Sequence, residues 1–384
     1  MRHSISLQFV SAALTVGGIS ASAIASTATF QGLGDLPGGT VDSRAYAVTN
    51  SGVVGGWAIS ANGQEAYRWT SATGMQALGD FSTGTFGSGI HAINADGSHM
   101  GGFGTTNTGT IATEFRVPGP VLTSLGTTPT YQPTWINGMS ADGTIVAGFS
   151  SSGRPFRSTP TATQQLPNYA GGGVPTNAMA VSADGFTVVG SGNSTLGLEA
   201  YRYTVAGGLQ GIGDLPGGQF QSQAWDVNAD GSVIVGAGNS TPFGTQAFRW
   251  TPSGIVGLPA GGTLYPRQAM GVSDDGNVVV GSASHLVSPF NSEPFIWDPA
   301  NGTRSLSAVL IAGGADLTGW SNLWVEDISP DGLTIVGYGR NANGADEAFI
   351  ATIPEPGSVA VLTLAAASLL RRARRVRPEA ISGR

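Results

Sequence analysis

The chain has 384 residues and a formal net charge of −7, with 60 glycines, no cysteine and only 11% charged residues. The absence of cysteine excludes disulfide bonds, thiolate metal sites and a cysteine nucleophile. A hydrophobic content of 40% with 15 Phe, 8 Tyr and 8 Trp excludes a disordered chain. Abundant glycine and scarce charge instead favour many short strands joined by tight turns.

Residues 1–25 have the pattern of a secretory signal peptide. A short polar region with Arg2 and His3 precedes an apolar stretch over residues 7–19. Ala23-Ile24-Ala25 then offers a small-residue cleavage site before Ser26. A buried helix of the mature protein is the alternative, but the small residues over 20–29 would make a poor core helix. We therefore expect export and removal of this segment.

One unit recurs seven times along the rest of the chain. Each copy has an apolar step, a tight turn and a mostly β-branched run that ends in glycine. Six of the turns have the form Asn/Ser-x-Asp-Gly, and the first reads Thr49-Asn50-Ser51-Gly52. The turn glycines, about 45 residues apart, are Gly52, Gly97, Gly143, Gly185, Gly231, Gly276 and Gly332. Asp-Gly is a strong hairpin signal because glycine takes positive φ without steric cost.

Two further segments complete each unit. An aromatic strand follows the turn, as in EAYRWT (65–70), and a short apolar segment follows that strand, as in MQALGD (75–80). Four short strands in about 45 residues are typical of a propeller blade. We predict an all-β, seven-bladed β-propeller of four-stranded blades over residues 26–353. An open β-solenoid is the alternative.

The phase of the repeat predicts how such a propeller would close. The mature chain opens with a segment of the outer-strand type, TFQGLGDLPGG (29–39), and its last unit ends on the aromatic strand, EAFIATIP (347–354). If residues 30–34 pair with residues 348–352, the last blade gains its fourth strand and no edge is left unpaired. We predict this pairing.

The C-terminal region has three parts in order. Pro354-Glu355-Pro356 comes first, then an apolar run over residues 359–370, then a basic cluster made of Arg371, Arg372, Arg374, Arg375 and Arg377. As a helix the apolar run would be about 20 Å long, short for a bilayer core of about 30 Å. The arginines would stay cytoplasmic and leave the body outside. Residues 378–384 form a short tail.

The C-terminal segment and the repeat each resemble a known family. The segment 354–377 resembles the PEP-CTERM sorting tail, which implies processing near Pro354-Glu355-Pro356 by an exosortase-type membrane transpeptidase. The repeat resembles the extracellular repeat of the HAF family, most specifically in GLGDLPGG (32–39), GIGDLPGG (211–218) and QAFRWT (246–251). The resemblance implies a secreted protein at the cell surface and supplies no catalytic residues. A permanent membrane anchor is the alternative reading of the tail.

The mature body is acidic, with 22 Asp and Glu against 10 Arg between residues 26 and 353, a formal charge of −12. Nucleic-acid binding is excluded because it needs a basic surface. Calcium at the acidic surface stays open without a located site, and we expect no other cofactor. His91 and His99 flank one turn but offer too few ligands for zinc. The segment 226–231 starts like an EF-hand loop yet has Ala237 at the twelfth position, which favours a plain turn.

Charged and aromatic residues recur at fixed positions of the aromatic strands. The arginines are Arg68, Arg116, Arg157, Arg202 and Arg249, and the glutamates are Glu65, Glu199, Glu293 and Glu347. An offset of three places Glu and Arg on opposite faces of a strand. We expect each to meet a neighbouring blade in a repeated structural ion pair. The alternating aromatics, such as Tyr67 and Trp69, are expected to pack between blades.

The last unit carries an insertion within residues 305–324 that contains Trp320 and Trp324. Exposed Trp can stack on sugar rings, while a role in closing or capping the repeat array is the alternative.

No G-x-S-x-G motif is present. We therefore expect a non-enzymatic, exported interaction module that contacts surface polysaccharide or protein. The alternative is a carbohydrate-binding protein or a glycan lyase or hydrolase using carboxylates of the central channel.

Overall fold

The computed structural model describes residues 27–81, 86–106, 109–116, 121–125, 132–241, 244–285 and 288–354. Their regular structure is nearly all antiparallel β-strand, so the predicted all-β class is confirmed. The predicted signal peptide and the sorting segment beyond Pro354 lie outside the described residues. Over the described ranges, no helix is both long enough and apolar enough to cross a bilayer.

Five of the sheets have four strands each, with neighbours in chain order. Their strands are β7 (Gly89–Ile93), β8 (His99–Thr106), β9 (Gly109–Arg116) and β10 (Val121–Ser124); β11 (Pro133–Met139), β12 (Val146–Ser150), β13 (Pro155–Thr159) and β14 (Ala162–Gln165); β15 (Val174–Val181), β16 (Thr187–Asn193), β17 (Leu198–Thr204) and β18 (Gly208–Gly213); β19 (Ser222–Val227), β20 (Ile234–Ser240), β21 (Gly244–Thr251) and β22 (Gly254–Gly257); and β23 (Leu264–Val272), β24 (Val279–His285), β25 (Ser288–Asp298) and β26 (Gly302–Ser305).

The remaining sheet has nine strands in two groups. One group holds β2 (Gly38–Val48), β3 (Val54–Ser60), β4 (Gly63–Thr70) and β5 (Gly74–Gly79), with β6 (Phe86–Gly87) beside β4. The other holds β27 (Ser321–Ile328), β28 (Thr334–Arg340), β29 (Asp346–Thr352) and β1 (Thr29–Gly32). A single parallel pair, Asp42 with Asp346, joins the two groups.

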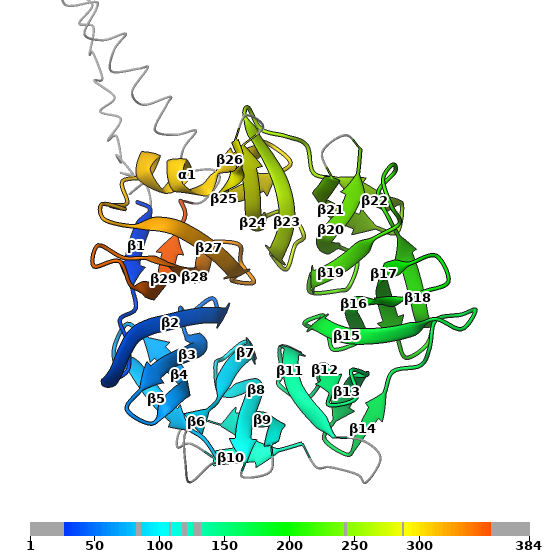
Figure 1. Cartoon of the computed structure of the whole chain (residues 1–384), viewed down its shortest axis with the longest axis horizontal. Helices are drawn as coiled ribbons and strands as arrows, with labels where there is room; N and C mark the ends of the chain where they lie inside the picture. The colour runs from blue at the N-terminus through cyan, green and yellow to red at the C-terminus, as the bar shows by residue number, and fades with distance from the viewer. Residues whose placement is uncertain are drawn as a thin grey trace, which may run out of the picture. The chain divides into compact units, whose positions relative to one another are not determined.

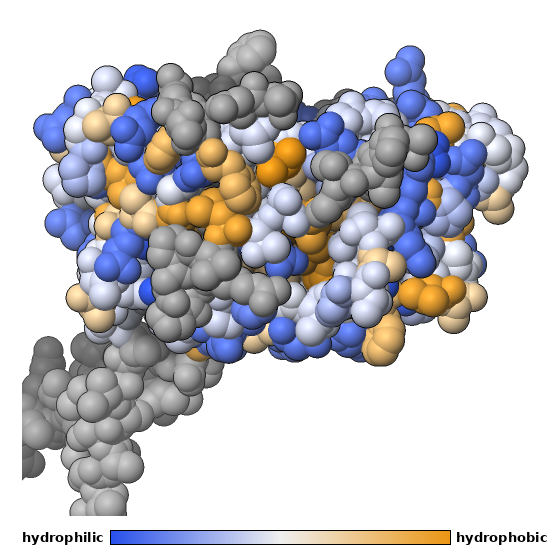
Figure 2. Space-filling model, turned by 90° about the horizontal axis from the view of Figure 1, so that it is seen from below, coloured by the Kyte–Doolittle hydropathy of each residue, from blue (hydrophilic) through white to orange (hydrophobic). Residues whose placement is uncertain are grey.

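The sheets lie side by side around a common centre, with β2, β7, β11, β15, β19, β23 and β27 innermost and the strands that follow each of them farther out (Figure 1). This radial order of four-stranded units is that of a β-propeller. Figure 2, a view from the side of β10 and β14, shows hydrophilic and hydrophobic residues interspersed on the visible rim.

The pairing expected for the N-terminal segment is present in the structure. β1 runs antiparallel to β29, with Phe30 opposite Ala351 and Gly32 opposite Phe349. Phe30 stacks on Phe349 at 5.0 Å between ring centroids and meets the edge of Trp320 at 5.1 Å. The first strand of the chain thus lies where the outermost strand of the last unit belongs.

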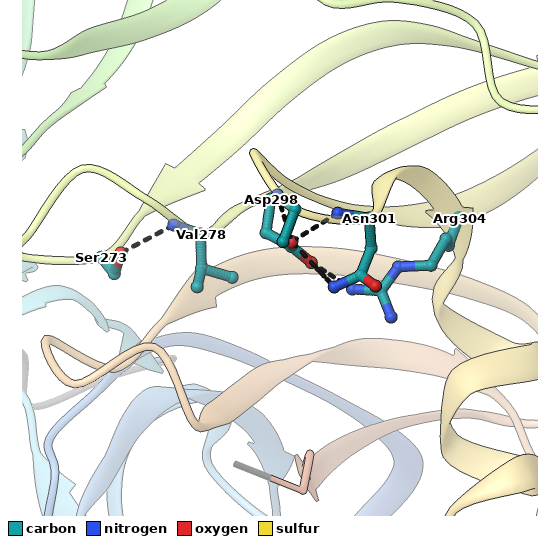
Figure 3. Close-up of polar contacts among 6 residues, drawn as sticks. Ser273, Val278, Asp298, Asn301 and Arg304 are labelled. Atoms are coloured by element: carbon teal, nitrogen blue, oxygen red, sulfur yellow. Dashed lines mark hydrogen bonds and ion pairs between the residues drawn. The ribbon is translucent and has the colours of Figure 1, made fainter. Parts of the chain in front are cut away.

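The predicted hairpin turns are confirmed in all seven units. Their glycines, from Gly52 to Gly332, have φ between 71° and 75°. The residue that opens each turn accepts a hydrogen bond from a backbone N–H at its far end, as Ser273 Oγ does from Val278 N at 2.9 Å (Figure 3). Ser and Asn recur at this position because their side-chain oxygens satisfy that donor.

Every innermost strand contains a β-bulge at the same place. The strand register shifts across Tyr46, His91, Asn137, Met179, Trp225, Met270 and Glu326. Opposite each bulge is the glycine that ends the β-branched run, for example Gly236 in β20, where an added Cβ would overlap the carbonyl oxygen of Gln223. Glycine at these positions lets the bulged backbone approach, and a bulge redirects its side chain.

The core lies between successive sheets. Six of the third strands each contain one fully buried aromatic residue, namely Tyr67, Phe156, Tyr201, Phe248, Phe295 and Phe349. Phe248, for example, belongs to one cluster with Val189 and Ala200 of the preceding sheet. The prediction that these aromatics pack between blades is confirmed.

The insertion in the last unit contains a helix that the sequence analysis did not predict. α1 (Leu306–Ala312) follows β26, and Ser305 caps it by accepting from Ala308 N. Leu306 and Leu310, four residues apart, are its buried residues. They pack in the cluster that also holds Phe349, so α1 covers the end of the last sheet rather than forming a binding loop.

Candidate functional site

A cavity of about 320 Å³ lies where the innermost strands meet. Its wall contains all seven bulge residues, Tyr46, His91, Asn137, Met179, Trp225, Met270 and Glu326. The wall also includes residues of the turns, of which Asn50 and Asp274 are exposed. The cavity therefore reaches solvent at the turn end of the innermost strands, and its volume falls at the low end of small-molecule sites.

The bulge position differs from its neighbours in chemical variety. The residue before the bulge is always apolar and buried: Ala45, Ile90, Ile136, Ala178, Ala224, Ala269 and Val325. The bulge residues themselves are a phenol, an imidazole, an amide, two thioethers, an indole and a carboxyl group. Packing would favour similar side chains in similar units, so varied side chains facing one cavity indicate a binding site.

Aromatic rings form one side of the cavity. Tyr46 and His91 stack at 4.5 Å between ring centroids, and Trp135 meets the edge of His91 at 5.3 Å. Burial lowers the pKa of His91 to about 4, so this imidazole is neutral at neutral pH. This side of the wall is uncharged.

Three carboxyl groups form another side of the wall. Asp226 accepts from Val272 N at 2.8 Å and from Val227 N at 2.7 Å, and Asp327 accepts from Val48 N at 2.9 Å and Ile328 N at 2.8 Å. Asp226 thus connects β19 to β23, and Asp327 connects β27 to β2. Glu326 makes no hydrogen bond within the part of the chain that the structure describes.

Burial is the main cause of the raised pKa values of these three carboxyl groups. It raises the pKa of Asp226 to about 7, against the lowering effect of its two backbone donors. It raises the pKa of Glu326 to about 7, against the attraction of Arg44, and raises that of Asp327 well above its ordinary value, with repulsion from Asp226 adding to the effect. Charge in this cavity is therefore poorly compensated.

We expect the stability of the protein to depend on the protonation of Asp226. Because the folded pKa is about 7 and the ordinary value is 3.8, the folded state holds more protons between these pH values, and the contribution of Asp226 is lost as pH rises through 7. The unfolding free energy of the wild type minus that of Asp226→Asn should fall by about 3 kcal/mol from pH 4 to pH 7. Urea unfolding measures it.

His91→Gln is the opposite-sign control for that measurement. The pKa of His91 is lowered to about 4, so the folded state holds fewer protons than the unfolded state below pH 6.5, and this residue's contribution grows as pH rises from 4 to 6.5. Parallel pH profiles for the wild type and Asp226→Asn would contradict a buried, titrating Asp226.

The sequence-predicted contact residues lie away from the central cavity. Trp320 packs on Phe30 near the β1–β29 pair. This position is compatible with the alternative role, that of closing or capping the repeat array. Trp324 instead lines a separate depression of about 370 Å³ with Arg267 and Gln268. A sugar contact at either tryptophan stays a prediction.

For Arg157, Arg202 and Arg249, the expected ion pairs with the recurring Glu residues are wrong. Arg157, Arg202 and Arg249 do reach the next unit, but they donate to the carbonyl oxygens of its turn glycines Gly185, Gly231 and Gly276 at 3.0–3.3 Å. The glutamates stay with their own sheet: Glu199 accepts from Gly213 N and Glu347 from Gly34 N. The arginines therefore cap the neighbouring turn, where a carbonyl is the nearest acceptor.

Other charged groups are also structural. Asp298 accepts from Asn301 and pairs with Arg304 within the β25–β26 hairpin (Figure 3). Asp226 and Asp230 bond separate backbone groups, which confirms a plain turn over an EF-hand loop. Among the described residues, no three His, Asp or Glu side chains lie close enough together to hold a metal ion.

The bulge residues were missed by the sequence analysis, although a signal for them exists. In an alignment of the seven units, the position after the buried Ala, Ile or Val is chemically diverse, whereas that preceding position is always apolar. A period-two reading of the strand assigns this residue to a packed face. Only the bulge turns it toward the centre.

No family model and no curated protein matches the chain. Among solved structures, TolB from Acinetobacter baumannii is 14% identical with a TM-score of 0.44, over 68% of this chain and 62% of that one. The Cps50 (Swd1) β-propeller domain of Myceliophteria thermophila is 10% identical, with a TM-score of 0.46 over 82% and 96%. A chain of a mitotic checkpoint complex is 14% identical, with a TM-score of 0.48 over 91% and 99%. These scores carry no argument about function.

Proposed function

We propose that the chain is an exported, non-enzymatic interaction module built as a closed seven-bladed β-propeller. On this proposal β1 is the fourth strand of the seventh blade, and the nine-stranded sheet is two blades joined at their contact. The module would use its central cavity to bind a surface polysaccharide or a protein. The single observation that carries the binding role is the ring of chemically varied bulge residues on a uniform framework.

A repeated hydrogen-bond pattern supports closure. Ser88 Oγ donates to Gly79 O at 2.8 Å and accepts from Ala66 N at 2.9 Å, which ties the second unit to the first. Ser222 makes the same two bonds between the fourth and fifth units. Ser43 makes them with Gly34 O at 2.7 Å and Ala348 N at 3.0 Å. The junction of the last unit with the first is therefore built like the internal junctions.

The ends of the chain support export and surface display. The signal-like residues 1–25 and the tail over 354–377 bracket the propeller, and the resemblance to HAF repeats and PEP-CTERM tails implies an exosortase-type enzyme as processing partner. The tail would contact the membrane before processing, or permanently if it is retained. The acidic body, at −12, suits a soluble extracellular surface.

Mass spectrometry of the exported protein tests the proposed export and C-terminal processing. We expect a mature N-terminus at Ser26 and a C-terminus close to Pro354-Glu355-Pro356. A mature protein that keeps Arg371–Arg377 would contradict transpeptidase processing and favour the permanent anchor. Retention of residues 1–25 would contradict export through a cleaved signal.

Capture experiments with the full chain test the binding role. A polysaccharide or protein from the surface of the producing cell should be retained by the wild type and lost with Trp225→Ala, while Trp324→Ala should retain it. Equal retention by both variants would contradict a role for the central cavity. Turnover of a polysaccharide, rather than binding, would contradict the non-enzymatic assignment.

A glycan-active enzyme is the second candidate, and one observation favours it. Glu326, with its pKa raised to about 7 beside the cavity, has the acidity of a general acid. Asp226 and Asp327 hold backbone donors with both carboxylate oxygens, which disfavours either as its partner. Loss of polysaccharide turnover in Glu326→Gln would establish this candidate.

A further inference from the structure

The charge lining the central cavity is one-sided. Four carboxyl groups belong to its wall, those of Asp226, Asp274, Glu326 and Asp327, and the described wall contains no arginine. His91 is the one basic side chain among these wall residues. Arg44 lies close enough to attract Glu326 but is outside the wall, with its guanidinium 4.4 Å from the ring of Tyr338 and 5.2 Å from that of Trp57.

The same wall offers polarizable faces to a positive charge. Tyr46, Trp225, Met179 and Met270 line the cavity together with Glu326. Aromatic faces attract ammonium and guanidinium groups through the ring quadrupole, most strongly where water is excluded. A largely buried carboxyl group beside aromatic residues suits an organic cation better than a neutral or anionic ligand.

A second observation points to a bound group. Trp225 Nε1 is buried and has no hydrogen-bond partner among the described residues. A buried indole N–H normally finds an acceptor, and a ligand carbonyl oxygen beside the cation would supply one. A lysine or arginine residue within a peptide carries both groups.

We propose that the central cavity binds an ammonium or guanidinium group, with Glu326 as its counter-ion and Tyr46 and Trp225 as its aromatic faces. This inference rests on the proposed function and specifies the ligand class of the same cavity. The source of the cation is a basic side chain of a protein or a free amine, and the two are separated by the probes below.

Three probes test the ligand class on the purified full chain by calorimetry. N-acetyl-lysine amide carries the ammonium and the peptide carbonyls, its side-chain-acetylated form has lost the charge, and cadaverine has only the ammonium groups. We expect the first to bind at least tenfold more tightly than the acetylated form. Equal binding of cadaverine indicates a free amine as the source, and weaker binding indicates a peptide.

Two variants locate the site. Glu326→Gln keeps the shape and removes the charge, so N-acetyl-lysine amide should bind at least tenfold more weakly. Asp316→Asn is the control, because Asp316 is exposed outside the cavity and an asparagine can still accept from Thr318 N. The Nε1–H resonance of Trp225, assigned with Trp225→Phe, should shift with the lysine probe in the wild type. Thermal unfolding shows that each variant is folded.

Several outcomes would overturn the inference. They are equal affinity for the charged and acetylated probes, or unchanged affinity in folded Glu326→Gln. Binding of a neutral glycan that is lost in Trp225→Ala, with no binding of either ammonium probe, would overturn the cation assignment while leaving the proposed interaction function intact. Equal retention of the captured ligand by Trp225→Ala and Trp324→Ala would count against the proposed function itself.

Discussion

Gly236→Ala is expected to lower the unfolding free energy by about 3 kcal/mol, in the upper range for overpacking of a filled core. The added Cβ would overlap the carbonyl oxygen of Gln223 and approach Phe248 Cζ to 2.8 Å. Neither can move freely, because Gln223 belongs to the bulged strand β19 and Phe248 is fully buried. Denaturant unfolding monitored by circular dichroism measures the loss.

Gly207→Ala is the matched control for this prediction. A Cβ at Gly207 would meet only the hydroxyl of Thr204 at 2.9 Å and the amide of Gln210 at 3.9 Å, both on side chains that can rotate. We expect a change below about 1 kcal/mol. Equal destabilisation by the two substitutions would mean that position 236 requires glycine for a reason other than the bulge.

The substitution at Gly236 also tests the origin of the central cavity. If the bulge in β19 relaxes to a regular ladder, the side chain of Trp225 leaves the centre, since a one-residue change of register moves a side chain to the other face. Binding at the cavity should then weaken in any Gly236→Ala protein that remains folded. The glycine pattern is thus both a packing requirement and the device that positions the site.

The repeat and its turns could be predicted because their determinants are local. Asp-Gly specifies a hairpin within four residues, and seven copies at one period specify stacked units. The pairing of β1 with β29 was predictable for a different reason: the phase of the repeat leaves one outer strand spare at the start and one missing at the end. No detailed geometry was needed for either.

The site could not be predicted in the same way, because its determinants lie across strands. The cavity depends on the bulges, and the bulges depend on a glycine such as Gly236 opposite a carbonyl of another strand. The prediction of an ion pair for Arg202 was wrong for the same reason. Strand alternation gave the face on which its side chain lies, but the nearest acceptor there is the carbonyl of Gly231 in the next turn.

Phe30→Ala should weaken the junction between the two ends of the propeller. We expect a loss of about 2 kcal/mol, below the usual range for a buried Phe→Ala change because Phe30 is half-buried. The side chain stacks on Phe349 and meets the edge of Trp320, so its removal loosens β1 from β29. Hydrogen exchange should show faster exchange in β29 and β1, with β15–β18 unchanged.

Phe186→Ala separates this junction effect from a general loss of aromatic area. Phe186 is 65% exposed, so its removal should change stability by less than about 0.5 kcal/mol and leave exchange in β29 unaltered. If the first strand completes the last blade, an edge left open in Phe30→Ala should also promote association of the chains, visible by light scattering. Unchanged exchange in β29 together with monomeric Phe30→Ala would mean that β1 is dispensable and that the ring, if closed, is held by the contacts of Ser43 and the turns alone.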